Sequence, residues 1–243
     1  MSPTIDHTFL MRARFYCRRA PENLTASSLA PEALGAEWRV PRWTQYVFSD
    51  ASTRETSRDG RAYLEPCGIC DANRDFFDFR TAWSPEGFAL TVVVAKKSEQ
   101  KTFANSELDS ADQIRVCLDA RDLKEVKRGT RFCYKFVFFP TAVDARKTLS
   151  PKARQVTISR AREQATAIDA DEIALASELR ADGYAFSAFF PAQTLVGYEP
   201  DSFNRLGLHF AVTDGARGVF ALQHYAPALY EEDPSLWPSF LLV

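Results

Sequence analysis

The chain has 243 residues, 46% of them hydrophobic and 13% aromatic, which is enough to bury one sizeable core. Its 30 basic and 32 acidic residues nearly balance, without the clustered positive charge that nucleic-acid binding needs. The first residues lack a basic start followed by an apolar run, and no segment reaches the roughly 20 apolar residues of a membrane span. We therefore expect one soluble, cytoplasmic domain over 1–243, with neither nucleic acid nor membrane as a partner.

The N-terminal part divides into a strand and an irregular stretch. Within residues 1–17, Phe15 and Cys17 alternate with Tyr16 and basic residues, which predicts a first strand. Residues 18–75 contain four prolines and polar clusters such as "SDASTRETSRDGR". This composition predicts an irregular surface segment wrapped around a main sandwich over 76–243.

Alternation becomes regular after residue 76. The runs "FFDFRTAW" and "FALTVVVAKK" flank "SPEG", whose Pro85 and Gly87 suit a tight turn, so a hairpin is expected. Residues 113–118 alternate as a half-buried strand. Both rows of 132–139 are largely apolar, with Lys135 the exception, which predicts a central strand covered on both faces. Pro140 ends that strand because it cannot donate to a sheet.

Helix propensity and periodicity conflict in "DEIALASELRADGYAFSAFFP". Alanine, glutamate and leucine favour a helix, whereas the apolar positions follow a period of two. We follow the period and predict a hairpin turning at "ADG", then one short helix near 191–196 that begins at Pro191. The next strand, "LGLHFAV", places His209 outward.

These elements predict an all-β fold: a two-sheet, mostly antiparallel, jelly-roll-like sandwich with an irregular N-terminal wrap and one short helix. Eight side chains share the expected inward rows of its strands. They are Ile114, Val116, Leu118, Phe186, Phe190, Leu206, Leu208 and Phe210.

Three stretches carry a resemblance to a known family: "ADQIRVCLDARD", "DGYAFSAFFPAQTLVGYEPDSFNRLGLHFAVTDG" and "DPSLWPSFLLV". In order and spacing they resemble the family 9 carbohydrate-binding modules and the wider group of DOMON-like sandwiches, over roughly residues 80–243. The resemblance implies a jelly-roll-like sandwich. It also implies a ligand of the saccharide kind, since many members bind sugar ends, often beside calcium.

A saccharide needs an aromatic platform and directional hydrogen bonds in one concave place. We therefore expect a set of accessible aromatic and polar side chains to form the ligand site: Trp43, Tyr198, Asn204, His209 and Gln223. Three further tryptophans could stack on a sugar or belong to the core. Burial is the expectation for Trp83 and Trp237, and Trp38 is left open.

Metal sites have two candidate sets. Cys67 and Cys70 in "CGIC" have the spacing of a zinc or redox pair, although no second pair follows at finger spacing, so an unliganded loop is the alternative. The five cysteines form an odd number, which fits reduced thiols. Four aspartates could offer oxygen to calcium, or cap turns and pair with Arg115 or Arg121. They are Asp112, Asp119, Asp122 and Asp214.

The sequence favours a non-enzymatic module that binds a saccharide or a related polar ligand. No serine elbow, phosphate loop or zinc-hydrolase helix is present, so no catalytic residue and no cofactor is predicted, with calcium or zinc possible as a bound ion. The alternatives are a metal- or haem-associated DOMON-like module and a protein-interaction module that uses the "CGIC" insert.

Overall fold

The computed structural model describes residues 14–40, 77–97, 112–214, 218–222 and 231–243. Its strands are β1 (Arg14–Arg19), β2 (Phe77–Ser84), β3 (Gly87–Val94), β4 (Gln113–Asp119), β5 (Cys133–Phe139), β6 (Lys152–Gln155), β7 (Ala174–Arg180), β8 (Gly183–Pro191), β9 (Arg205–Asp214), β10 (Gly218–Ala221) and β11 (Ser239–Leu242). The complete helical elements in these ranges are 3-10 turns: η1 (Ala26–Ser28), η2 (Ala36–Trp38), η5 (Ala170–Glu172), η6 (Ala192–Thr194) and η7 (Pro234–Leu236). The all-β prediction is confirmed, and the 3-10 turn η6 lies where one short helix was expected near 191–196.

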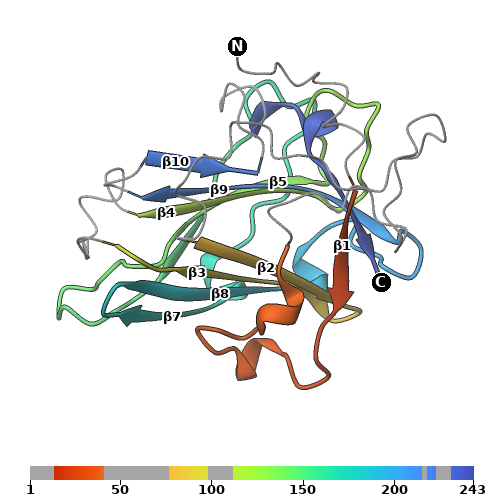
Figure 1. The fold of residues 1–243 in the computed structure, drawn as a ribbon. Coiled ribbons are helices and arrows are strands. Elements are labelled where there is room, and N and C mark those ends of the chain that lie inside the picture. Colours follow the sequence, from red (N-terminus) through yellow and green to blue (C-terminus); the bar gives the residue numbers. More distant parts are fainter. Residues whose placement is uncertain (1–13, 41–76, 98–111, 215–217, 223–230) are drawn as a thin grey trace, which may run out of the picture.

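Two sheets pack face to face (Figure 1). Sheet I has the order β6-β5-β4-β9-β11-β1, with β10 also paired to β9, and sheet II has the order β1-β2-β3-β8-β7. The two pairings of β1 are parallel, and all the other pairings are antiparallel. The structure is the mostly antiparallel sandwich that the alternation predicted.

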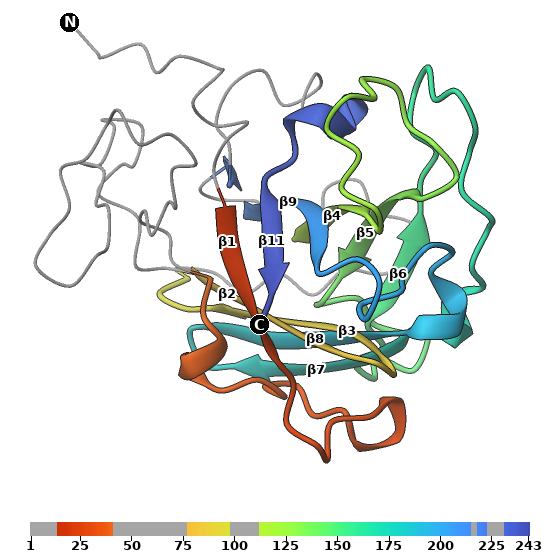
Figure 2. The ribbon, with the colours of Figure 1, turned by 90° about the vertical axis from the view of Figure 1, so that its right-hand side faces the viewer.

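Strand β1 joins the two sheets. Its first four residues pair with β11, whereas Arg18 and Arg19 pair with β2, so the strand passes from one sheet to the other (Figure 2). Phe15 and Cys17 are buried and Tyr16 is exposed, as the alternation predicted.

The core lies between the inward rows of the sheets, and all eight predicted interior residues belong to it. Phe136 of β5 is fully buried, with its ring centroid 5.0 Å from that of Phe190 in β8. Phe79 of β2 stacks on Phe210 of β9, which connects the sheets a second time. Aromatic rings of this size supply most of the apolar area that is removed from water.

Both predicted hairpins are present. β2 and β3 close with Ser84 opposite Gly87, where a Cβ on Gly87 would lie 2.2 Å from the carbonyl oxygen of Phe190. Only glycine allows that approach of β8. β7 and β8 close with Arg180 opposite Gly183, so the period-two interpretation of residues 174–180 is confirmed over the helical one.

Residues 20–40 cover the outer face of sheet II. Leu24 and Leu34 pack with Ala82, Ala89 and Phe189 of the strands beneath. The backbone N–H of Leu34 donates to Thr91 Oγ1 at 3.2 Å. The predicted N-terminal wrap is confirmed for this part, and 41–75 lie outside the described residues. No helix in the described ranges is long and apolar enough to cross a membrane.

Candidate functional site

The outer face of sheet II is occupied by the protein's own chain. Buried Arg80 donates to Asp78, to Glu32 and to the carbonyl oxygen of Leu34. Arg39 forms a two-pronged ion pair with the same Asp78, both bonds being 2.7 Å. These contacts hold residues 32–39 against the sheet, and a second group of charged side chains lies on the outer face of sheet I, beneath residues 231–237.

Pairing registers gather polar side chains on that outer face. The inward rows of β4, β5 and β9 form the core, so the opposite rows point away from it. Cys117 lies opposite both Lys135 and His209, and these three form one cross-strand row. Arg115 follows on the same side of β4, two residues away.

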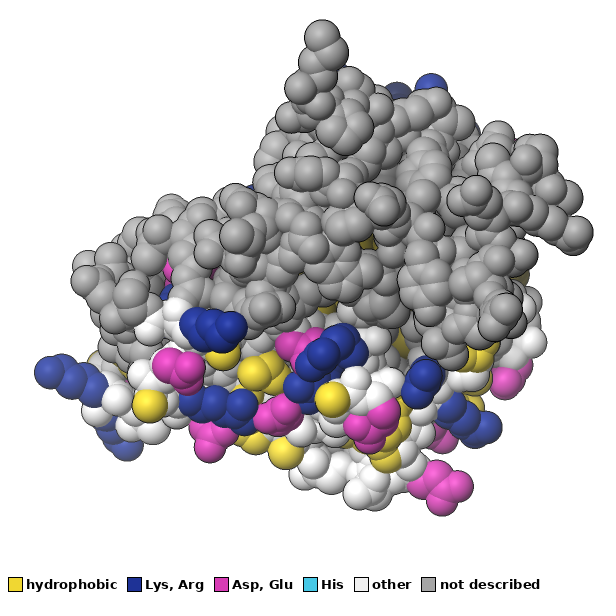
Figure 3. Space-filling view, in the orientation of Figure 1, with side chains coloured by type: hydrophobic (Ala, Val, Ile, Leu, Met, Phe, Trp, Pro, Cys, Tyr) yellow, Lys and Arg dark blue, Asp and Glu magenta, His cyan; other side chains and the backbone are white. Residues whose placement is uncertain are grey.

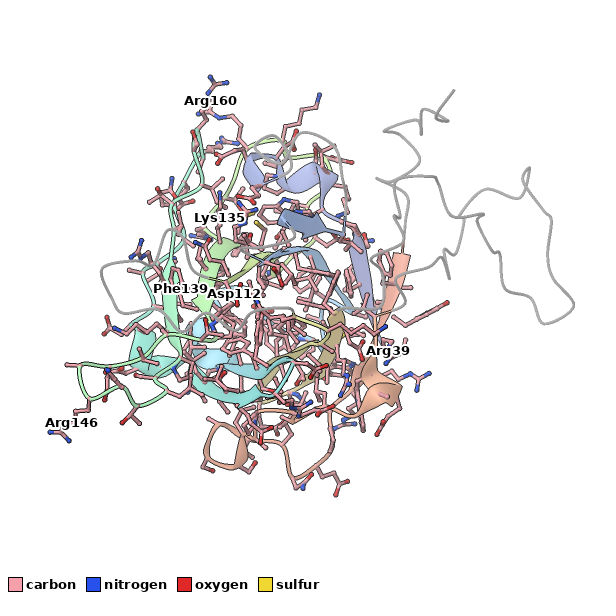
Figure 4. All side chains as sticks on the ribbon, turned by 60° about the vertical axis from the view of Figure 1, so that its left-hand side comes forward. Arg39, Asp112, Lys135, Phe139, Arg146 and Arg160 are labelled. Carbon is pink, nitrogen blue, oxygen red and sulfur yellow. The ribbon has the colours of Figure 1, made fainter. Side chains whose placement is uncertain are left out.

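Two carboxylates complete this group. Arg115 Nη1 lies 3.1 Å from Glu231 Oε1, and Lys135 Nζ lies 2.8 Å from Glu231 Oε2 and 3.5 Å from Glu232 Oε1. We call Arg115, Lys135, His209, Glu231 and Glu232 the outer-face cluster; Figure 4 marks the position of Lys135. Two cations face two anions around a histidine, so the cluster is nearly charge-balanced.

The segment after Glu232 anchors these carboxylates to sheet I. Asp233 caps η7 by accepting from the backbone N–H and the hydroxyl of Ser235. Trp237 is then fully buried against Cys117, Cys133 and Ile158. The core role predicted for Trp237 is confirmed, and its packing places the two glutamates above β4 and β5.

Burial sets the protonation of the cluster. The pKa of His209 falls from 6.5 to about 4, chiefly because burial disfavours the imidazolium. The charge of Glu231 opposes this fall, and the charges of Arg115 and Lys135 add to it. Burial alone would also lower the pKa of Lys135, but its hydrogen bond and charge attraction to Glu231 raise it above its ordinary value. At neutral pH the cluster therefore holds a neutral imidazole beside a charged ammonium.

The cluster keeps unused hydrogen-bonding capacity. Arg115 Nε and Glu232 Oε2 are both buried and have no hydrogen-bond partner among the described residues. Native proteins rarely leave such groups unpaired. A donor and an acceptor within one charge-balanced group suit a neutral ligand whose hydroxyls both donate and accept.

Three of the five predicted ligand residues, Tyr198, Asn204 and His209, lie in the described part of the chain. Tyr198 is buried, and its hydroxyl bonds the carbonyl oxygens of Ser84 and Gly87 at 2.9 Å. His209 is also buried, so the expectation that these two side chains are accessible is wrong. Asn204 is exposed.

Trp43 and Gln223 lie outside the described residues, as do Cys67 and Cys70. Within the described part of the chain, no three histidine, cysteine, aspartate or glutamate side chains are grouped to hold a metal ion.

An exposed ring that the prediction missed lies beside Asn204. Phe203 is 37% exposed and stacks under the Arg121 guanidinium at 3.8 Å, while Arg121 Nη2 pairs with Glu199 at 2.7 Å. Gly197, with φ +91, allows Arg121 and a second ring to approach this loop. The guanidinium covers one face of Phe203, which makes this ring a structural element of the loop.

The aspartates take structural roles. Asp119 accepts from the backbone N–H groups of Arg121 and Leu123, which is the predicted capping of a turn. Asp112 and Asp214 flank the buried ammonium of Lys97 at 2.6 and 3.2 Å. Arg115 and Arg121 pair with glutamates, so the expected pairing of the aspartates with these arginines is wrong.

Asp122 also has a structural role: it accepts a hydrogen bond from Ser239 Oγ at 2.6 Å and pairs with Lys124. Of the remaining tryptophans, Trp83 and Trp38 are only half-buried. Their Nε1 atoms donate to the carbonyl oxygens of Val243 and Arg19. Burial of Trp83 is therefore only partly confirmed.

Sequence reasoning missed most of the outer-face cluster. One signal was available for Lys135, the single charge in a strand whose two rows are otherwise apolar. The sequence contains no such signal for Glu231 and Glu232, because no pattern indicates which strand face a later acidic segment covers.

Comparison with known proteins identifies the architecture. No protein-family model matches the chain, and no curated protein does. The solved structures include a family 9 carbohydrate-binding module from Caldicellulosiruptor kristjanssonii in complex with cellotriose, at 14% identity and a TM-score of 0.53, covering 94% of this chain and 93% of that one. The glucose complex of a family 9 module from the same organism matches at 14% identity and a TM-score of 0.52, covering 95% of each chain. The chain thus has the fold of the family 9 carbohydrate-binding modules.

Proposed function

We propose that the protein is a non-enzymatic saccharide-binding module whose ligand site is the outer-face cluster. The observation that carries the proposal is the buried, unpartnered pair of atoms Arg115 Nε and Glu232 Oε2 within a charge-balanced group. Arg115 Nε can donate and Glu232 Oε2 can accept, and a sugar hydroxyl is a group that does both. Structures of the same fold hold glucose and cellotriose, which supports a glucose-type sugar.

Binding is favoured over hydrolysis by the placement of the acids. Glu231 and Glu232 are adjacent in sequence, and both pair with the Lys135 ammonium. A glycosidase needs two carboxyl groups on opposite sides of the scissile bond, one of them a protonated acid. Two neighbours on one segment that pair with the same ammonium do not meet that requirement.

Calorimetric titration of the full chain with glucose and with cellotriose tests the proposal, with and without calcium. We expect heat of binding for the parent protein. Arg115→Lys removes Nε as a donor while keeping the charge, and Glu232→Gln removes the free anionic acceptor. Each change should weaken binding about tenfold, the usual effect of one charge-assisted hydrogen bond.

Arg146→Lys is the matched control, because Arg146 is exposed on a loop away from Lys135 (Figure 4). No heat for either sugar at millimolar concentration would refute the function. Parent-like binding by both cluster variants would leave the function standing and refute the site.

A further inference from the structure

Among the described strands, β6 and β7 end the two sheets and differ in character. β6, with four residues, ends sheet I and presents Lys152 and Arg154, two like charges that repel a second strand of the same sequence. β7, with seven residues, ends sheet II and has neither lysine nor proline. Its charged side chains, Glu178 and Arg180, are opposite in sign. β6 therefore carries the usual protection against edge pairing, whereas β7 does not.

The open edge of β7 follows from its hairpin. A two-residue loop closes the hairpin at Arg180 and Gly183, so Ala174, Ala176, Glu178 and Arg180 exchange backbone hydrogen bonds with β8. The backbone groups of the odd-numbered residues Leu175, Ser177 and Leu179 then point away from β8. None of these groups pairs with another backbone group in the described ranges.

We propose that β7 pairs antiparallel with β7 of a second copy of this chain, about a two-fold axis at Ser177. In this register Ser177 faces its own equivalent, and Leu175 faces Leu179 of the second copy. Each facing pair exchanges two backbone hydrogen bonds, so three pairs give about six. All seven residues of β7 take part, and any shifted two-fold register pairs fewer.

The side chains fit this register on both faces of the strand. On the outer face Glu178 lies opposite Ala176 of the second copy, and Arg180 lies opposite Ala174, so no like charges meet. On the inner face Leu175 and Leu179 already pack on the core, and the facing leucines extend that apolar row across the junction. A strand of another protein would need the same alternation of side chains to fit this edge. A second copy of β7 already has it.

One strand pair buries less than the roughly 1,000 Å² of a stable interface, so the dimer should be weak and concentration-dependent.

A mixing experiment with two single variants, Ala176→Cys and Glu178→Cys, is selective for the register. These residues face each other at a non-hydrogen-bonded pair, where Cα atoms lie about 4.5 Å apart, within disulfide range. In a glutathione buffer the 176–178 cross-link should form in the mixture, and neither variant alone should form a 176–176 or 178–178 link.

Peptide mapping distinguishes this cross-link from disulfides formed by the native thiols. Three of those thiols, Cys17, Cys117 and Cys133, are buried. Ser177→Pro removes an N–H that the hairpin does not use, and sedimentation should show that it abolishes the dimer. Ser177→Ala is the matched control: it loses the hydroxyl bonds to Pro140 and Ala185 but keeps the N–H, so it should still dimerise. A parent protein that stays monomeric, a mixture that links no better than either variant alone, or a dimer that survives Ser177→Pro would each overturn the proposal.

Discussion

A buried neutral imidazole makes the outer-face cluster sensitive to pH at the scale of a single residue. The pKa of His209 is about 4 in the folded chain and 6.5 when unfolded, so below pH 6.5 the unfolded state binds the extra proton. The stability that His209 contributes is complete above pH 6.5 and is lost as the pH falls toward 4. The free energy of unfolding should drop by about 2 kcal/mol between pH 7.5 and pH 5 from this group.

Urea unfolding of the parent and of His209→Gln at both pH values measures this difference. Glutamine does not titrate, so the variant should retain only the pH dependence of the remaining groups. If the free energy of unfolding changed equally between the two pH values in both proteins, His209 would be accessible to protonation in the folded state.

A second residue-scale prediction concerns the core. Phe136→Ala should lower the free energy of unfolding by roughly 3–5 kcal/mol, because it removes a fully buried ring from contact with Phe190. Tyr16→Ala removes a ring that is 40% exposed and serves as the control, with a loss of about 1 kcal/mol or less. Urea unfolding at pH 7.5 measures both; similar losses would contradict the packing of β5.

Residue roles were less predictable than strand faces. Alternation placed His209 on the outward side of β9, which is correct, but a segment more than twenty residues later buries that side. Tyr198 lies in a loop, where exposure is the usual expectation. It is buried because its hydroxyl reaches two carbonyl oxygens at the end of the β2–β3 hairpin. Sequence periodicity shows the direction of a side chain and not what covers it.

At the scale of elements, Arg80 holds the N-terminal segment to sheet II. Arg80→Leu should cost on the order of 3 kcal/mol, since it removes one partner of a buried ion-pair network. Hydrogen exchange at the amide of Leu34 should accelerate, because this amide is held by Thr91 in the same contact. Exchange in the β4–β5 pair should change far less.

Arg180→Leu is the matched control. Arg180 pairs with the same Glu32 but is about one-third exposed, so its loss should cost less than about 1 kcal/mol. If both variants released Leu34 equally, the segment would be held by Glu32 and not by Arg80.

The elements themselves were largely predictable, because each long strand has one largely apolar row. β7 is the clearest case. Its residues favour a helix, yet they form a strand because their period of two suits pairing with β8. β6 was missed, since four residues with two cations carry no apolar row. The two-sided burial of β5 was predicted, although β5 lies next to the short edge strand β6 and not at the centre of sheet I.

At the scale of the whole molecule, we expect one cooperative unfolding transition. Inward residues of both sheets form a single core, and β1 hydrogen-bonds to both. Tryptophan fluorescence and far-ultraviolet circular dichroism should therefore report the same urea midpoint. Two separated midpoints would indicate that the sheets are independent units.

Charge at this scale agrees with the near balance of the composition. On the face shown in Figure 3, basic and acidic side chains are interspersed over the described residues, and none of the coloured surface there forms a broad region of one sign. The described surface on this face therefore has no broad region of one sign that would attract a charged ligand from a distance.

The shared strand β1 has a consequence for synthesis on the ribosome. Its parallel partner β11 lies more than two hundred residues later in the chain, so the Phe15–Phe240 contact cannot form until residue 240 has emerged. At ordinary elongation rates this delay is on the order of ten seconds or more. During that time β1 has no β11 to pair with, while the β2–β3 and β7–β8 hairpins can already close from neighbouring residues. Closing the seam between the sheets should therefore be the last step of folding, and a nascent chain stalled before β11 is the form most exposed to aggregation and chaperone binding.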